Sequence, residues 1–222
     1  MKTYEKVTHT FEPVYDENSR ILILGTFPSV KSREQQFYYG HPQNRFWKLL
    51  AALTGWKVPK TISEKKELLL QNGIAIWDVV ASCEIVGSSD SSIRNVVPAD
   101  LNRILQAAPV RKIYANGGKA FELYQKYAFP VTGRPIEKLP STSPANAAWQ
   151  MDRLKEDIRA KFEDSCLTFT DTDSEDQEYL QLFAFISELS FDVYLKKHMI
   201  EMLIDQLREE SIPDSKTKKA KK

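Results

Sequence analysis

The sequence has few residues that bind metals or form disulfides. Its 222 residues include only Cys83 and Cys166, too few for a disulfide framework or for the four thiolates of a typical iron–sulfur cluster. The three histidines, His9, His41 and His198, are widely separated and form no zinc-binding pattern. We therefore expect neither a metal nor another cofactor.

Long apolar runs are also missing. No stretch approaches the ~18 apolar residues that a membrane helix needs. The first residues, MKTYEKVTHTFEP, lack the apolar core of a signal peptide. These absences predict an intracellular, cytoplasmic protein that does not contact a membrane.

Several common catalytic and nucleotide-binding motifs are absent. The sequence contains neither G-x-x-x-x-G-K-[ST] nor G-x-G-x-x-G, so it encodes no standard phosphate-binding loop. It also lacks the G-x-S-x-G of serine hydrolases. The loops expected at the ends of its strands hold few carboxylates, which disfavours the paired acids of a typical glycosidase.

Short apolar runs that alternate with helical patterns predict an α/β fold. Strands are expected at 21–24, 74–80, 110–115 and 136–139, and helices at 46–54, 63–72, 98–107, 119–127 and 147–162. This alternation favours a three-layer α/β/α domain with a central, mostly parallel four-stranded sheet. We assign residues 1–162 to this domain.

The remainder of the chain differs in composition. Residues 163–178 are acidic and polar and predict a linker or loop, 179–210 predict a helical extension, and 211–222 form a basic tail expected to be disordered. The extension is most simply a packed appendage, with binding of a protein partner as the alternative. Residues 1–160 carry a formal charge of +6 and residues 161–222 carry −5, so the first part is compatible with a polyanionic partner.

The stretch from residue 21 to residue 54 organises the chain as a strand, a long loop and a helix. Its loop, 25–44, is one of three that follow predicted strands, together with 116–118 and 141–146. Loops at the carboxyl ends of parallel strands converge on one crevice, where ligands bind. Asp78 is the one acid expected near this crevice; it would bond loop amides or, as an alternative, act in catalysis.

Three motifs in these loops resemble the uracil-DNA glycosylase superfamily. They are Gly25-Thr26-Phe27-Pro28-Ser29, Tyr39-Gly40-His41-Pro42-Gln43-Asn44-Arg45-Phe46-Trp47-Lys48 and Pro140-Ser141-Thr142-Ser143-Pro144-Ala145-Asn146. They occur in the family's order and spacing, over roughly residues 8 to 160. Within the superfamily they are most similar to the hypoxanthine-DNA glycosylases, also called DNA-deoxyinosine glycosylases. The H-P-x-N-R-F-W-K stretch is similar to the mismatch-specific uracil-DNA glycosylases too.

The resemblance implies a monomeric, monofunctional DNA glycosylase associated with the nucleoid. Its partner would be double-stranded DNA with a deaminated base, most of all hypoxanthine, which is flipped out and hydrolysed off to leave an abasic site. Many superfamily members hold the attacking water with an acid or amide in the first motif, where this chain has Phe27. In the hypoxanthine branch Asn44 takes this role, which makes Asn44 the catalytic candidate.

The other expected site residues fall into two groups. Those expected to contact the base are Gly25, Thr26, Phe27, Pro28, Ser29, Tyr39 and Asn116. Those expected to contact DNA are His41, Ser141, Thr142, Ser143, Ala145 and Asn146. No lysine in the motifs is placed like an imine-forming nucleophile.

Each of these roles has a simpler structural alternative. Asn44 would also cap the helix that begins at Phe46, and the ring of Tyr39 would also pack within its loop. His41 is expected to bond backbone, with a phosphate contact as the alternative, and Ser141 and Ser143 would serve only as turn and cap residues. The same-class alternative is a uracil or mismatch glycosylase. An alternative of another class is a non-catalytic DNA-binding or partner-binding module.

Overall fold

The computed structural model describes residues 3–163 and residue 202. The predicted linker, helical extension and basic tail lie outside these residues, apart from residues 163 and 202. Within the described part, no helix is both long enough and apolar enough to cross a lipid bilayer.

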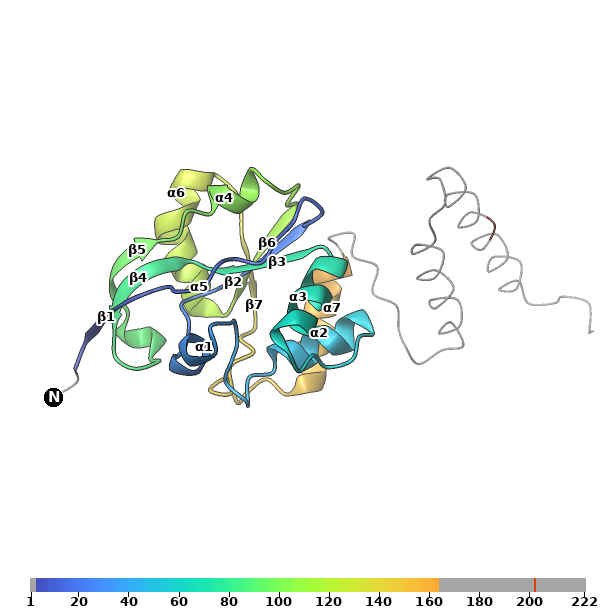
Figure 1. The fold of residues 1–222 in the computed structure, drawn as a ribbon, viewed down its shortest axis with the longest axis horizontal. Helices are drawn as coiled ribbons and strands as arrows, with labels where there is room; N and C mark the ends of the chain where they lie inside the picture. The colour runs from blue at the N-terminus through green and yellow to red at the C-terminus, as the bar shows by residue number, and fades with distance from the viewer. Residues whose placement is uncertain (1–2, 164–201, 203–222) are drawn as a thin grey trace, which may run out of the picture. The chain divides into compact units, whose positions relative to one another are not determined.

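A four-stranded parallel sheet forms the centre of the domain, as the sequence predicts (Figure 1). Its strands are β2 (Ile21–Gly25), β3 (Ile74–Asp78), β6 (Lys112–Asn116) and β7 (Glu137–Leu139), in the order β3-β2-β6-β7. All five residues of β2 are buried, as is typical of a parallel strand covered on both faces. Gly25 pairs with Asp78 and Asn116 with Leu139, so all four strands end at one edge.

Helices cover both faces of this sheet, which confirms the three-layer prediction. Helices α2 (Phe46–Thr54), α3 (Ile62–Gln71) and α7 (Met151–Glu163) pack on the face that carries Ile21 and Ile23. Helices α4 (Asn102–Leu105), α5 (Gly118–Leu123) and α6 (Phe129–Thr132), with the π-helical turn η2 (Tyr124–Ala128), surround the face with Leu22 and Leu24.

A second sheet was not predicted. Strands β1 (Glu5–Thr8), β4 (Val80–Ile85) and β5 (Arg94–Pro98) form an antiparallel sheet in the order β1-β4-β5, and the short helix η1 (Asp90–Ser92) connects β4 with β5. The predicted strand 74–80 is therefore divided, with β3 ending at Asp78 and β4 starting at Val80. Strands β1 and β5 are largely exposed and lack apolar runs, so their sequence carries little strand signal.

Several helix boundaries also differ from the prediction. The stretch 98–107 holds only the single-turn α4, and the last helix begins at Met151 rather than at 147. Helix α3 starts after Thr61, whose hydroxyl accepts from Glu64 N–H while Glu64 bonds back in a capping box. An additional helix, α1 (Val30–Gln35), lies within the long loop and is capped by Ser29.

Candidate active site

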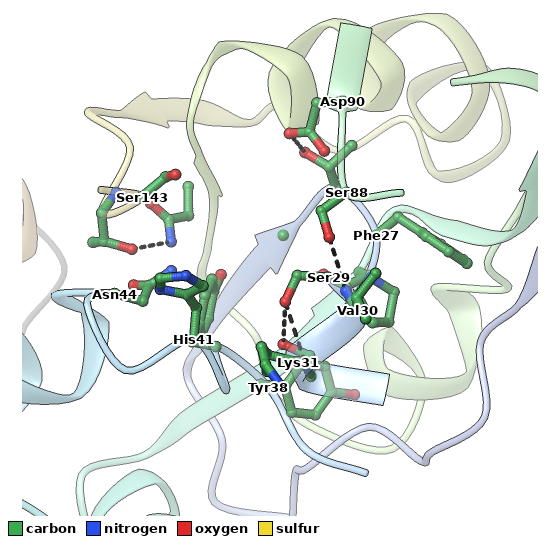
Figure 2. A pocket seen from close by; sticks show the side chains of 18 of the residues that line it. Phe27, Ser29, Val30, Lys31, Tyr38, His41, Asn44, Ser88, Asp90 and Ser143 are labelled. Carbon is green, nitrogen blue, oxygen red and sulfur yellow. Dashed lines mark hydrogen bonds between the residues drawn. The ribbon is translucent and has the colours of Figure 1, made fainter. Parts of the chain in front are cut away.

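A cavity of about 290 Å³ opens where β2, β3 and β6 end. Its wall includes almost every residue predicted for the site: Gly25, Thr26, Phe27, Pro28, Ser29, Tyr39, His41, Asn44, Asn116, Ser141, Thr142 and Ser143. Figure 2 shows side chains from the loop after β2, the segment around Ser88 and Asp90, and the loop after β7 around this space. Ala145 and Asn146 do not line it. The three separated motifs therefore meet at one place.

Asn44 lies in a tight turn whose hydrogen bonds fix its side chain. The Asn44 N–H donates to the carbonyl of His41 at 2.8 Å, and the Phe46 N–H donates to Asn44 Oδ1 at 3.0 Å. The N-cap position of α2 is Arg45, so Asn44 lies one residue before the cap and bonds the first N–H of the helix. This bond also orients the amide, because only the oxygen can accept from Phe46. A carbonyl oxygen has two lone pairs, so Oδ1 keeps one acceptor position.

His41 is held by its own backbone, as the structural alternative for this residue describes. Its Nδ1 accepts a hydrogen bond from the Gln43 N–H at 3.2 Å. In the neutral imidazole the proton must then reside on Nε2. The ring thus keeps one free donor at the rim of the cavity.

Tyr39 has an unusual backbone and a buried hydroxyl. Its φ of +50° lies in the left-handed region, and its ring stacks on Phe46 with 3.9 Å between centroids. Among the described residues, its hydroxyl has no hydrogen-bond partner. Burial strongly raises the pKa of this hydroxyl, as does the nearby charge of Asp78, while the side chain of Asn116 acts in the opposite direction. One face of the ring is therefore packed against the first residue of α2.

Asp78, at the end of β3, is the most enclosed acid of the site. Only 4% of the residue is exposed, and Oδ2 lies 2.9 Å from Nε2 of His9. A Cβ on residue 25 would stand 2.1 Å from Asp78 Oδ1 and 3.3 Å from the hydroxyl of Tyr39. Glycine at position 25 is thus what allows the Asp78 carboxylate to reach the cavity. Among the described residues, no loop amide donates to Asp78, so the expected amide bonds are replaced by His9.

Asp90 is a second acid in the cavity wall, which corrects the expectation that Asp78 is alone there. Its Oδ2 accepts a hydrogen bond from the hydroxyl of Thr26 at 3.2 Å. The residue as a whole is exposed, but the pKa of its carboxyl is raised. Desolvation is the main cause of the rise and the charge of Asp78 adds to it, while the bond from Thr26 acts in the opposite direction. Next to it, Ser88 Oγ accepts from the Val30 N–H at 2.9 Å (Figure 2).

Asn116 and Thr142 join the end of β6 to the loop after β7. Asn116 Nδ2 donates to Thr142 Oγ1 at 2.9 Å, and Asn116 Oδ1 accepts from the Thr142 N–H at 3.0 Å. Thr142 is only 2% exposed, and its hydroxyl is hydrogen-bonded to Asn116. Gly117 follows with φ +109°, and a Cβ there would stand 3.1 Å from Cβ of Ser141. The two segments are therefore in direct contact.

Arg45 holds the same loop from the other side. Its guanidinium donates to the main-chain carbonyls of five residues, Ser141, Thr142, Ser143, Asn146 and Trp149. Its Nη2 lies 2.7 Å from the Ser143 carbonyl oxygen. The Arg45 N–H adds a bond to the Thr142 carbonyl at 3.1 Å. Arg45 thus connects the turn that carries Asn44 to the whole loop after β7.

The resulting site combines aromatic walls, a buried carboxylate and a polar rim. Phe27 is 8% exposed, and the rim offers the hydroxyls of Ser141 and Ser143. Among the described residues, no group of three or more His, Cys, Asp or Glu side chains is arranged to hold a metal ion. The arrangement suits a flat ring that is apolar on its faces and polar on its edge.

The sequence model of the Uracil DNA glycosylase superfamily matches residues 12–164. The chain belongs to this superfamily. It is similar to a protein named hypoxanthine DNA glycosylase from Methanosarcina acetivorans, with 38% identity over 148 residues that cover 66% of this chain and 92% of the relative. A second protein of that name, from Methanosarcina barkeri, is 34% identical over 137 residues, which cover 61% of this chain and 86% of the relative.

Solved structures agree with this assignment. A solution NMR structure from Methanosarcina acetivorans, of a protein described as a candidate uracil DNA glycosylase, superposes with a TM-score of 0.60. It is 35% identical and covers 70% of this chain and 96% of its own. The predicted family and the predicted fold class are confirmed. The superfamily match begins after β1 and His9, so His9 comes from a segment outside it.

Three residues of this superfamily site were missed from the sequence. Arg45 lies within the second motif, and its place in that motif could have identified it as a site residue. Asp90 lies in the polar stretch 87–92, which gave no indication of where it would fold. His9 is 69 residues from its partner Asp78, and nothing local to β1 indicated the contact.

Proposed function

We propose that this chain is a DNA glycosylase that removes hypoxanthine from deoxyinosine in double-stranded DNA and leaves an abasic site. The observation that carries the proposal is that Phe27 and Asn44 line one cavity in a chain 38% identical to a hypoxanthine DNA glycosylase. Phe27 stands where many superfamily members hold the attacking water and cannot accept a hydrogen bond from it. The resemblance to the hypoxanthine branch assigns this task to Asn44.

Asn44 would hold the water through the free lone pair of Oδ1. The bond from Phe46 already fixes the position of this oxygen, so little reorganisation is needed when DNA binds. An amide is a weak base, but attack on a cation-like sugar requires little basicity. The role of Asn44 would therefore be to position the water for attack on the sugar, rather than to remove a proton from the water early in the reaction.

The departing base would be stabilised by the main chain of residues 26–29. Negative charge develops on the base as the glycosidic bond breaks, and preorganised N–H donors in an enclosed site lower the energy of that state. This turn forms part of the cavity wall, and Ser29 anchors it by capping α1 through a bond from the Ser32 N–H at 3.2 Å. Phe27 adds an apolar surface against which the ring lies.

Asp78 is suited to read the edge of the base. Hypoxanthine carries a proton on N1 and a carbonyl at C6, so its edge offers a donor beside an acceptor. An ionised carboxylate only accepts hydrogen bonds, and Oδ1 of Asp78 is directed past Gly25 while Oδ2 is bonded to His9. Oδ1 would accept from N1–H. Asn116, the earlier candidate for this task, already has both ends of its amide bonded to Thr142.

The loop after β7 would contact the DNA backbone. The Ser141 and Ser143 hydroxyls and the free Nε2–H of His41 lie at the rim of the cavity and can donate to phosphate oxygens. Ala145 and Asn146 lie outside the cavity in the same loop. There they would contact the DNA strand at the position from which the base has been flipped out.

The proposal is tested by incubating the full chain with labelled duplexes that contain inosine, uracil or a G·T mismatch, followed by alkaline cleavage of abasic sites. Hypoxanthine release faster than uracil release is expected, and no product from inosine would overturn the proposal. Faster release from uracil would favour the second candidate, a uracil glycosylase. That candidate is supported by Asp78, because uracil also presents an imino N–H that a carboxylate can accept.

Asn44→Ala tests the role of the water-holding amide. We expect the single-turnover excision rate to fall about 100-fold or more, the range seen when one preorganised polar group is removed from an active site. Duplex binding should be nearly unchanged. The exposed neighbour Gln43 supplies the control, because Gln43→Ala should keep the rate. An unchanged rate in Asn44→Ala would transfer the water to another group.

A further inference from the structure

We propose that His9 is a positioning residue that determines how Asp78 presents its carboxylate to the base. His9 follows β1, a strand that lies outside the superfamily match. The His9 and Asp78 side chains are each only 6% exposed, and Nε2 lies 2.9 Å from Oδ2. This inference rests on the proposed function, because it concerns the group that would read the deaminated base.

The surroundings of His9 fix its ring in one place. Its centroid lies 4.4 Å from that of Phe11, 6.0 Å from Tyr38 and 6.3 Å from Phe27. The His9 N–H also donates to the carbonyl of Ala81 at 2.7 Å, which ties the segment to the second sheet. The imidazole is therefore held by aromatic rings and by backbone, and its one described polar contact is with Asp78.

The bond decides which carboxylate oxygen is presented to the base. When Asp78 is ionised, a neutral imidazole must carry its proton on Nε2 in order to donate to Oδ2. This occupies one carboxylate oxygen and leaves Oδ1 as the acceptor that faces the cavity past Gly25. His9 would thus orient the carboxylate so that Oδ1 can accept from an imino N–H.

The other titratable groups near Asp78 do not supply such a donor. Asp90 lines the same cavity; desolvation raises the pKa of its carboxyl, the Thr26 bond lowers it, and the like charge of Asp78 raises it further. Burial raises the pKa of the Tyr38 and Tyr39 hydroxyls, and the charge of Asp78 adds to the rise in both. Tyr38 Oη donates to the carbonyl of Glu12, and Tyr39 Oη is without a partner among the described residues. His9 is the hydrogen-bond donor that the structure places on Asp78.

Two variants separate the donor from the ring. His9→Phe keeps an aromatic ring among Phe11, Tyr38 and Phe27 but removes the donor, whereas His9→Gln keeps an N–H at similar reach. We expect His9→Phe to reduce the excision of hypoxanthine about 10- to 100-fold, as when the orienting partner of a functional ligand is removed. His9→Gln should recover most of the rate. The exposed Thr8, one residue earlier in β1, provides a control, because Thr8→Ala should behave as wild type.

A double-mutant cycle gives a readout that a purely structural role would not move. In an Asp78→Asn background, His9→Phe should add little further loss, because both changes act through one carboxylate. Full additivity of the two losses would overturn the inference.

Nuclear magnetic resonance of the wild-type full chain tests the same contact without any substitution. The ¹⁵N shifts of the His9 ring should report a proton on Nε2, and a neutral ring protonated only on Nδ1 would overturn the inference. Failure of the proposed function is distinguishable, since it would appear as wild-type protein that does not release hypoxanthine. A wild-type protein that does release it, with His9→Phe equally active, would refute the role of His9 alone.

Discussion

Replacing Arg45 by methionine should loosen the loop after β7 and weaken its contact with DNA. Methionine keeps an apolar side chain of similar length and removes the donors that reach five main-chain carbonyls. Those carbonyls belong to residues 141–149, which include the hydroxyls proposed to contact DNA. The change therefore leaves all proposed contact groups in the sequence and alters only how they are held.

The expected loss of folding stability can be worked out from two of these hydrogen bonds. Nη2 lies 2.7 Å from the Ser143 carbonyl and 3.0 Å from the Asn146 carbonyl. A hydrogen bond from a charged donor contributes about 1.5–3 kcal/mol. Because the side chain is half-buried and the loop can partly relax toward water, we expect a loss near the lower end, about 3–4 kcal/mol. In a chain of this size that corresponds to a Tm lower by about 6–16 °C.

Thermal unfolding and DNA binding together measure the effect. Besides the lower Tm, Kd for an inosine duplex should rise about tenfold, equivalent to about 1.4 kcal/mol, and Kd for the matching single strand should rise less. Arg45→Lys should be intermediate, because an ammonium group cannot reproduce the planar set of five N–H donors. The control is Arg94→Met, which removes an exposed pair with Glu84 that contributes less than about 1 kcal/mol. A Tm within 2 °C of wild type, with unchanged duplex binding, would refute the reasoning.

Two further changes test other parts of the site. Gly25→Ala would place a Cβ 2.1 Å from Asp78 Oδ1, so we expect it to displace the carboxylate, cost about 1–3 kcal/mol and reduce excision severely; Gly118→Ala, where a Cβ meets nothing within 4 Å, should be neutral or slightly stabilising in both assays. Asp90→Asn should raise Tm near pH 7. A raised folded-state pKa means that the native protein binds the proton more tightly than the unfolded chain, so stability falls as the pH rises through that window. The Tm difference between Asp90→Asn and wild type should therefore shrink as the pH is lowered below the ordinary Asp pKa of about 3.9, and a difference that grows on acidification would contradict the raised pKa.

The central sheet could be predicted because its signal is local. Ile21 to Leu24 form an apolar run that stops at a glycine, which is what a strand covered on both faces requires. The same logic places the three motifs at one edge, since parallel strands end together. By contrast, β1 and β5 have mostly exposed residues, and their pairing with β4 depends on long-range contacts that no local pattern encodes.

The site was predictable to the extent that side chains carry its chemistry. Asn44 and Phe27 were identifiable as candidates because they stand in motifs that resemble those of the superfamily. The role of Arg45 was not identifiable, because its partners are main-chain carbonyls, which every residue possesses and no sequence pattern marks. The His9–Asp78 contact joins segments 69 residues apart, so it required the fold to bring β1 beside the end of β3.

These bonds also explain why the three motifs act as one unit. Arg45 joins the Asn44 turn to the loop after β7, and Asn116 joins that loop to the end of β6. The residue that would hold the water and the hydroxyls that would contact DNA are therefore fixed relative to each other. The hydrogen bonds of the Arg45 guanidinium and of the Asn116 amide hold them in place. Because these contacts use backbone atoms and buried side chains, the residues at the rim can differ without changing the geometry of the chemistry. In the proposed function, base selection would depend on Asp78, whose carboxylate has His9 as its single hydrogen-bond partner within residues 3–163.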